Sequence, residues 1–255
     1  KTGFPESYYL RFLTAGIFFS LACAHVRKIT DHVNPGYPIL RKKPPILLDT
    51  RFLLRKLMRN PNYRIFIFFY TLMLVSASVA GAFIIPYANE AGGLTAQQVS
   101  LFAVLWFGSS LAFGLPLGKL GDRSGYRAVG AILAGLLMLS QIAVLLRPCL
   151  PVFMAAYMPM SLAAASALTL LNNMSAELCA DVSPSRLISI GSLIPIPFVF
   201  CIVALCGQIL DHSRNYLAVY LISVTLAAIS LAGFALLVRE PRRSRLVVLK
   251  PLDRK

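Results

Sequence analysis

Long, uninterrupted apolar runs constrain this 255-residue chain more than any other feature. A helix that crosses a bilayer needs roughly 20 mostly apolar residues. Seven stretches qualify, at 8–26, 64–86, 99–117, 128–146, 150–171, 187–210 and 216–238. Continuous runs of this kind exclude the alternating pattern of a membrane β-barrel. The sequence therefore predicts an all-α integral membrane protein with seven transmembrane helices.

The basic residues predict how these helices are oriented. The chain carries 25 Lys and Arg against 10 Asp and Glu, a net charge of +15, which in a soluble protein would indicate nucleic acid binding. Only 14% of the residues are charged, however, compared with about 25% in soluble domains. Seven alternating spans place 21 of the 25 basic residues on one side, and the positive-inside rule makes that side cytoplasmic.

We therefore expect a protein of the cell (inner) membrane, with its N-terminus outside and its C-terminus in the cytoplasm. The positive charge then reflects topology, together with attraction to the headgroups of the lipid bilayer. No nucleic acid partner is expected, because the basic residues are divided among several loops and tails without a nucleic-acid-binding motif.

The segment 27–60 is a basic connection that is longer than any other loop. Within it, 46–59 is amphipathic, with Leu54 and Leu57 on one helical face and Arg55 and Arg59 on another. Such a helix lies in the membrane interface or caps the cytoplasmic ends of the bundle. The expected order is a single transmembrane helix (1–26), this cytoplasmic linker (27–60), a six-helix group (61–238) and a basic cytoplasmic tail (239–255).

A glycine-rich segment follows the third span. It contains Gly118, Asp122, Arg123, Gly125 and Arg127. These residues match the signature loop of the major facilitator superfamily, G-x-x-x-D-[RK]-x-G-x-[RK]-[RK], which the segment resembles except at its last basic position. The segment also lies between the second and third members of the six-span group, which is the position of the signature loop in each half of a facilitator.

The resemblance implies that the chain is similar to the C-terminal half of such a transporter, a six-helix half bundle preceded by one helix. The first span would be the sixth helix of the family, 27–60 the central linker and 61–238 helices seven to twelve. The five N-terminal helices would be absent. The implied function is transport of a small-molecule solute by alternating access, with the missing N-terminal half as partner, without cofactor and without enzymatic activity.

The signature residues are expected to act as a conformational gate. Asp122 is the only acid in a basic segment, so it can cap a helix N-terminus or pair with Arg123 or Arg127. The resemblance implies that Asp122 meets the N-terminus of the fifth helix of the group, near Ser185 and Arg186, and holds the cytoplasmic side shut. The alternative is an aspartate that stabilises only its own turn.

The resemblance also implies that the first, second, fourth and fifth spans of the group line the solute pathway. The candidate residues in these spans are Tyr70, Ser78, Trp106, Ser109, Tyr157, Ser161, Pro195 and Pro197. Hydroxyl groups in an apolar helix often bond the carbonyl four residues back, so ordinary helix packing is the competing interpretation for the serines. The two prolines remove backbone donors and should kink or break their helix.

Other functions fit the residues less well. No metal site is expected, because the five cysteines form no C-x-x-C and there are only three histidines. No acid lies deep in a span, so any proton-coupling group lies outside this chain or transport is not proton-driven. A seven-span receptor shares the topology, but the glycines around Asp122 and Arg123 favour a loop where a receptor has a helix end. A self-associating half-transporter is the remaining alternative.

Overall fold

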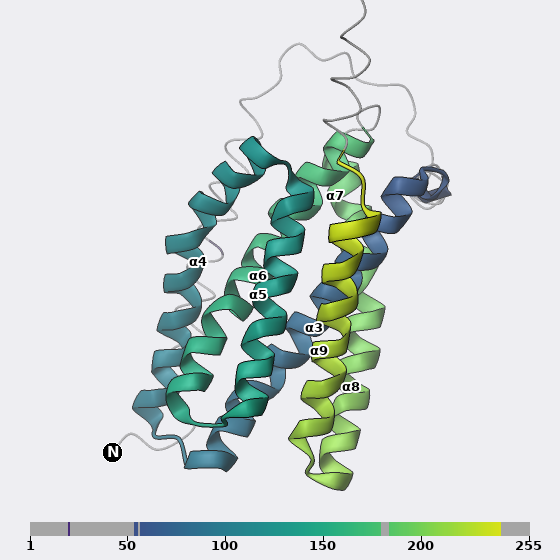
Figure 1. The fold of residues 1–255 in the computed structure, drawn as a ribbon. Coiled ribbons are helices and arrows are strands. Elements are labelled where there is room, and N and C mark those ends of the chain that lie inside the picture. The colour runs from purple at the N-terminus through teal and green to yellow at the C-terminus, as the bar shows by residue number, and fades with distance from the viewer. Residues whose placement is uncertain (1–19, 21–53, 56, 180–183, 241–255) are drawn as a thin grey trace, which may run out of the picture. The chain divides into compact units, whose positions relative to one another are not determined.

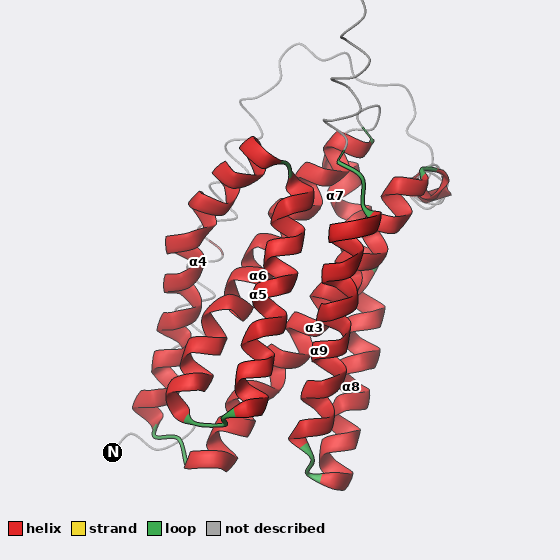
Figure 2. Ribbon diagram, viewed as in Figure 1, coloured by secondary structure: helices red, strands yellow, loops and turns green. Residues whose placement is uncertain are grey.

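The computed structural model describes residues 20, 54–55, 57–179 and 184–240, and the elements within them are all helices (Figure 2). Six stretches of these residues are long and apolar enough to cross a membrane. The all-α prediction is thus confirmed for the described residues, and their six long apolar helices suggest an integral membrane protein. The predicted span at 8–26, most of the linker and the tail after residue 240 lie outside the described residues, so the count of seven spans stays a prediction.

The helices follow one another in a single compact unit of the chain, Thr50–Lys255. The first four spans are α3, α4, α5 and α6, at Pro61–Gly92, Ala96–Ser124, Tyr126–Leu146 and Leu150–Leu178 (Figure 1). The fifth is divided into α7, Pro184–Leu193, and α8, Pro195–Ser213. The sixth is α9, Tyr216–Ala232, which runs into a π-helical turn, η1, at Gly233–Leu237.

Several helices are longer than their apolar runs predict. α3 has 32 residues, which corresponds to about 48 Å of helix, against about 30 Å for the hydrocarbon core of a bilayer. Polar side chains begin α3: Asn60 caps the helix by accepting hydrogen bonds from the backbone of Asn62 and Tyr63, and Pro61 occupies the first turn. The ends of this helix therefore extend into the headgroup layers.

The packing of the six spans has an internal exchange symmetry. α3 packs on α9 and α8, as α6 packs on α5 and α4. Exchanging the first three spans for the last three, in order, converts each of these pairs into another of them, while the pairs α3–α6 and α5–α9 map onto themselves. The contact of α6 with α7 has no comparable counterpart between α3 and α4, so the symmetry is incomplete. Each set has an odd number of antiparallel spans, so the second set runs opposite to the first.

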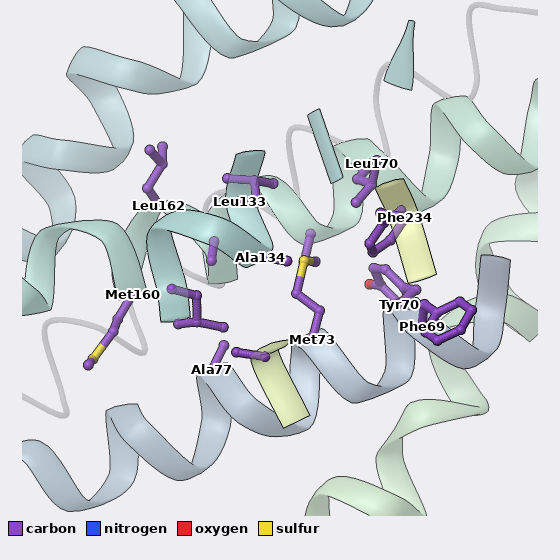
Figure 3. Packing of buried hydrophobic residues seen from close by; sticks show 14 of the residues in the cluster. Phe69, Tyr70, Met73, Ala77, Leu133, Ala134, Met160, Leu162, Leu170 and Phe234 are labelled. Carbon is purple, nitrogen blue, oxygen red and sulfur yellow. The ribbon is translucent and has the colours of Figure 1, made fainter. Parts of the chain in front are cut away.

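The core lies where α3, α5, α6 and the end of α9 meet. Figure 3 shows Met73 extending from α3 toward Ala134 of α5, with Tyr70 and Phe234 close by. Lipid is as apolar as these side chains, so close van der Waals packing rather than escape from water holds such helices together. α4 and α8 share little of this core. In α4 only Phe102, Ser109, Leu117 and Gly121 are buried.

The end of the predicted amphipathic helix is described and is helical at 54–55 and 57–59. Leu57 is 1% exposed and belongs to the bundle core, whereas Arg55 and Arg59 are exposed. Leu54, predicted on the same face as Leu57, is 37% exposed. The choice between the interfacial and the capping interpretation therefore stays a prediction. The preceding part of the predicted helix, 46–53, lies outside the described residues.

Candidate functional site

The segment with the signature pattern is mostly helical. α4 continues through Asp122 and Arg123 to Ser124, so the prediction that this pair lies in a loop is wrong. A helix tolerates single glycines at a modest energetic cost. Gly118 and Gly121 therefore stay helical, and only Gly125 leaves the helical region, with a φ of 91°. Gly121 has a packing role instead: a Cβ atom there would lie 2.5 Å from the ring of Tyr126. The pair therefore does not distinguish this chain from a seven-span receptor.

Gly125 is a one-residue turn between α4 and α5, and Glu240 lies against it. The Glu240 carboxylate accepts a hydrogen bond of 3.1 Å from the backbone N–H of Arg127. It also fills the space that a side chain at position 125 would need. A carboxylate at a helix N-terminus is stabilised by the aligned peptide dipoles, by about 0.3–1 kcal/mol. The acid that follows the sixth span thus caps the third span.

The Arg127 side chain makes the return contact. Its Nε donates to the carbonyl of Phe234 at 3.0 Å, and its terminal nitrogen donates to the carbonyl of Ala235. Both carbonyls belong to η1, where the π-helical turn ends the sixth span. A cation at a helix C-terminus is favourable for the same dipole reason. Arg127 and Glu240 therefore cap each other's helices; these reciprocal contacts are called the α5–η1 joint below.

Asp122 has a local contact, since its carboxylate accepts a 2.8 Å hydrogen bond from the Tyr126 hydroxyl. This contact fits the alternative in which the aspartate stabilises its own turn. Arg123 is exposed and makes no side-chain hydrogen bond within the described part of the chain. The side chains of Ser185 and Arg186, at the start of α7, lie outside the described residues, so the gating contact stays a prediction.

Four of the eight predicted pathway residues meet between α4 and α6. Trp106 and Tyr157 are half-buried, with ring centroids 5.3 Å apart. Ser109 and Ser161 are buried, and their hydroxyl groups contact each other directly. Phe102, which the sequence did not single out, packs edge-on against Tyr157 with centroids 5.1 Å apart. These five residues are called the α4–α6 cluster.

Two other predicted residues lie apart from this cluster. Tyr70 is 1% exposed and packs against Phe66 in the core. Ser78 donates to the Leu74 carbonyl, the ordinary helix contact for a serine, and lies beside a 650 Å³ apolar groove between α3 and α8.

The prediction for the proline pair is confirmed. The fifth span is interrupted at Ile194, and α8 begins with Pro195, which is buried; Pro197 follows in its first turn and is exposed. Proline lacks the backbone donor that would continue α7 into α8.

Three polar side chains outside the predicted set hold the bundle together, those of Glu240, Asn62 and Gln141. Glu240 caps α5. Asn62 and Arg239 exchange two hydrogen bonds of 2.9 Å, which tie the start of α3 to the end of the sixth span. Gln141 is fully buried and donates to Ser76 at 3.0 Å. Only Gln141 carried a clear signal, because it is the one side-chain amide within its apolar run.

Within the described residues no group of His, Cys, Asp or Glu side chains is placed to hold a metal ion. Neither models of known protein families nor curated protein sequences match this chain. Its function is therefore inferred from the fold, the α5–η1 joint and the α4–α6 cluster.

Proposed function

We propose that this chain is one half of a membrane transporter that moves a small solute by alternating access, similar to the C-terminal half of a major facilitator. The observation that carries the proposal is the exchange symmetry of the six spans. Oppositely oriented repeats allow one scaffold to open toward either side of the membrane, because the two repeats can adopt each other's arrangement. A seven-span receptor or a membrane-embedded enzyme has no need of this symmetry.

The α5–η1 joint supports the proposal. It lies in the signature segment, and its two contacts bind the third span of one repeat to the third span of the other. Alternating access needs halves that move as rigid bodies. A joint between the two repeats is suited to keep this half rigid while it rocks.

We propose the α4–α6 cluster as the part of this half that contacts the solute. Trp106 and Tyr157 offer half-buried aromatic surface, and the cluster contains no charged residue. The proposed solute therefore binds through apolar and hydroxyl contacts with this half. Asp122 is proposed to close the pathway at the α4–α5 end, which the distribution of basic residues assigns to the cytoplasm.

A second candidate function, self-association of two such halves, is favoured by the faces that this unit leaves uncovered. Phe107 and Leu111 of α4 are 73% and 79% exposed, and Phe200 of α8 is 74% exposed. A complementary half or a second copy would cover these faces.

Solute uptake tests the function. Proteoliposomes containing the full-length gene product are incubated with a mixture of neutral and charged metabolites. The contents of the vesicles are then measured by mass spectrometry. We expect saturable, protein-dependent accumulation of at least one solute, lowered about tenfold or more by Trp106→Ala, which removes a large contact surface. Accumulation of nothing above empty vesicles would contradict the proposal. The mass of the active particle distinguishes a self-associated half from a complete transporter.

A further inference from the structure

A cavity of 160 Å³ lies between α4, α5 and α6, close to the α4–α5 end of the bundle. Three hydroxyl residues line it, Ser110 on α4 and Ser166 and Thr169 on α6, and Tyr126 of α5 lines it as well. None of its lining residues is charged. Its position is distinct from the α4–α6 cluster and from the α5–η1 joint, although Ser110 adjoins Ser109 in the chain.

Two of these hydroxyl groups differ from most others in the bundle. Ser110, like Thr71 and Ser78, donates to a carbonyl of its own helix. Ser166 is 9% exposed and forms no hydrogen bond with any of the described residues, and Thr169, which is exposed, forms none either. An unpaired hydroxyl group in an apolar interior costs about 1–3 kcal/mol. The buried Ser166 hydroxyl therefore indicates a partner that is neither backbone nor side chain.

The α4 wall of the cavity contains two glycines, across from Ser166 and Thr169 of α6. Cβ atoms placed on Gly114 and Gly118 would meet no atom within 4 Å, although both residues line the cavity. Packing in this arrangement therefore does not require glycine at either position. The two missing side chains leave room across from the Ser166 hydroxyl, so the cavity combines free space with a free donor.

We propose that this cavity is a water site, filled by ordered water molecules that hydrogen-bond to Ser166 and Thr169. Its volume holds about five water molecules at the density of the liquid. A buried water needs two to four polar partners, and the three hydroxyl groups supply these together with neighbouring waters. The proposal does not depend on the transport function.

The site has a consequence for the α4–α6 interface. Water at Ser110 extends hydration toward the buried Ser109–Ser161 pair. At the other end the cavity reaches Tyr126, whose hydroxyl binds Asp122. The helices α4 and α6 are therefore joined partly through exchangeable water rather than through dry packing alone.

Thiol reactivity tests the proposal. Ser166→Cys is introduced into the full chain with its five native cysteines replaced by alanine, in lipid nanodiscs. The matched control is Leu139→Cys on α5, at a similar depth but 60% exposed on the outer surface. Methanethiosulfonates react with the thiolate, which forms in water rather than in lipid, so the cysteine at the buried position 166 should react about tenfold or more faster than the control.

A filled cavity provides the second arm of this test. Gly114→Leu places a side chain in the open space and should return the reactivity of Ser166→Cys to that of the control. Equal rates at Ser166→Cys and Leu139→Cys would overturn the proposal. Fast labelling that survives Gly114→Leu would also overturn it, because the water would then lie elsewhere.

Radiolytic footprinting keeps the proposal testable if these variants fail to fold. Hydroxyl radicals formed from internal water oxidise the side chains next to it. Leu170 lines the cavity and its neighbour Leu171 does not, although both are almost fully buried, at 1% and 0% exposure. Faster oxidation of Leu170 is expected in the unmodified chain. Equal oxidation of the two leucines would show a dry cavity and overturn the proposal.

Discussion

Gln141 connects three helices from the middle of the core. Its amide nitrogen on α5 donates to Ser76 of α3, while Ser76 and Ser223 of α9 each donate to the other's backbone carbonyl. The amide oxygen of Gln141 is buried and has no hydrogen-bond partner. This group therefore holds α5 to the α3–α9 pair while carrying an unsatisfied acceptor.

The two polar partners should be energetically coupled. Ser76→Ala leaves the whole Gln141 amide unpaired and should lower the free energy of unfolding by about 1–3 kcal/mol. Gln141→Met removes the unsatisfied oxygen together with the bond, so its cost should be smaller. In the double variant the cost should be less than the sum of the two single costs. Unfolding in mixed detergent micelles measures all four proteins, and additive costs would contradict the coupling.

The sequence predicted some of these side-chain roles and missed others. Ser109 and Ser161 were each predicted as pathway residues, and they meet because α4 packs on α6. Ser76 looks like any serine in an apolar run, and its partner Ser223 is 147 residues away. Such pairing depends on which helices become neighbours, which hydropathy does not encode.

Glu240 should stabilise the α5–η1 joint through its charge. Glu240→Gln keeps the shape but removes the charge at the start of α5, which should cost about 0.3–1 kcal/mol. Asp211→Asn, at an exposed position in the last turn of α8, serves as the control and should not lower stability, because a carboxylate is unfavourable at a helix C-terminus. Thermal unfolding followed by circular dichroism makes the comparison. A loss for Glu240→Gln that is no larger than the change in the control would contradict a capping role.

The π-helical turn η1 owes its position to a close approach between elements. Gly233 begins this turn, and a Cβ atom there would overlap the ring of Phe69 on α3. Ser230 also donates to the Phe69 carbonyl at 2.9 Å. The turn directs its carbonyls toward Arg127, so the junction of α3 and α9 and the α5–η1 joint depend on the same glycine.

Gly233→Ala should therefore separate α3 from the end of α9. We expect a loss of roughly 1–3 kcal/mol in unfolding free energy, typical of overpacking. The control is Gly81→Ala within α3, where a methyl group meets nothing within 4 Å and alanine should add up to about 1 kcal/mol of helix stability. Both are measured by detergent unfolding. A Gly233→Ala chain as stable as the original would contradict the close approach.

At the scale of elements, the sequence predicted the six spans in the described residues and the break at Pro195, because apolar length and proline act locally. It misplaced the end of α4, because glycines were taken as helix breakers although Gly118 and Gly121 stay helical. It also missed η1, since a π-helical turn follows from the contacts of Gly233 and Arg127 with other helices.

At the scale of the whole molecule, the exchange symmetry could not be predicted from the sequence. Positive residues and span lengths predict the number and direction of helices but not which of them are neighbours. Pairing α3 with α9 and α6 with α5 required the three-dimensional packing. The resemblance of the signature segment led to the same proposed function by a different route, through local sequence.

Accessibility of the α4–α6 cluster from both sides of the membrane tests alternating access most directly. Tyr157→Cys is labelled with a membrane-impermeant thiol reagent, applied separately to each side of sealed vesicles containing the chain as its gene encodes it. We predict reaction from both sides. Asp122→Asn should raise the rate from the α4–α5 side by about tenfold, which corresponds to about 1.4 kcal/mol of differential stabilisation, and lower the rate from the other side. Reaction from one side only, unaffected by Asp122→Asn, would contradict the account.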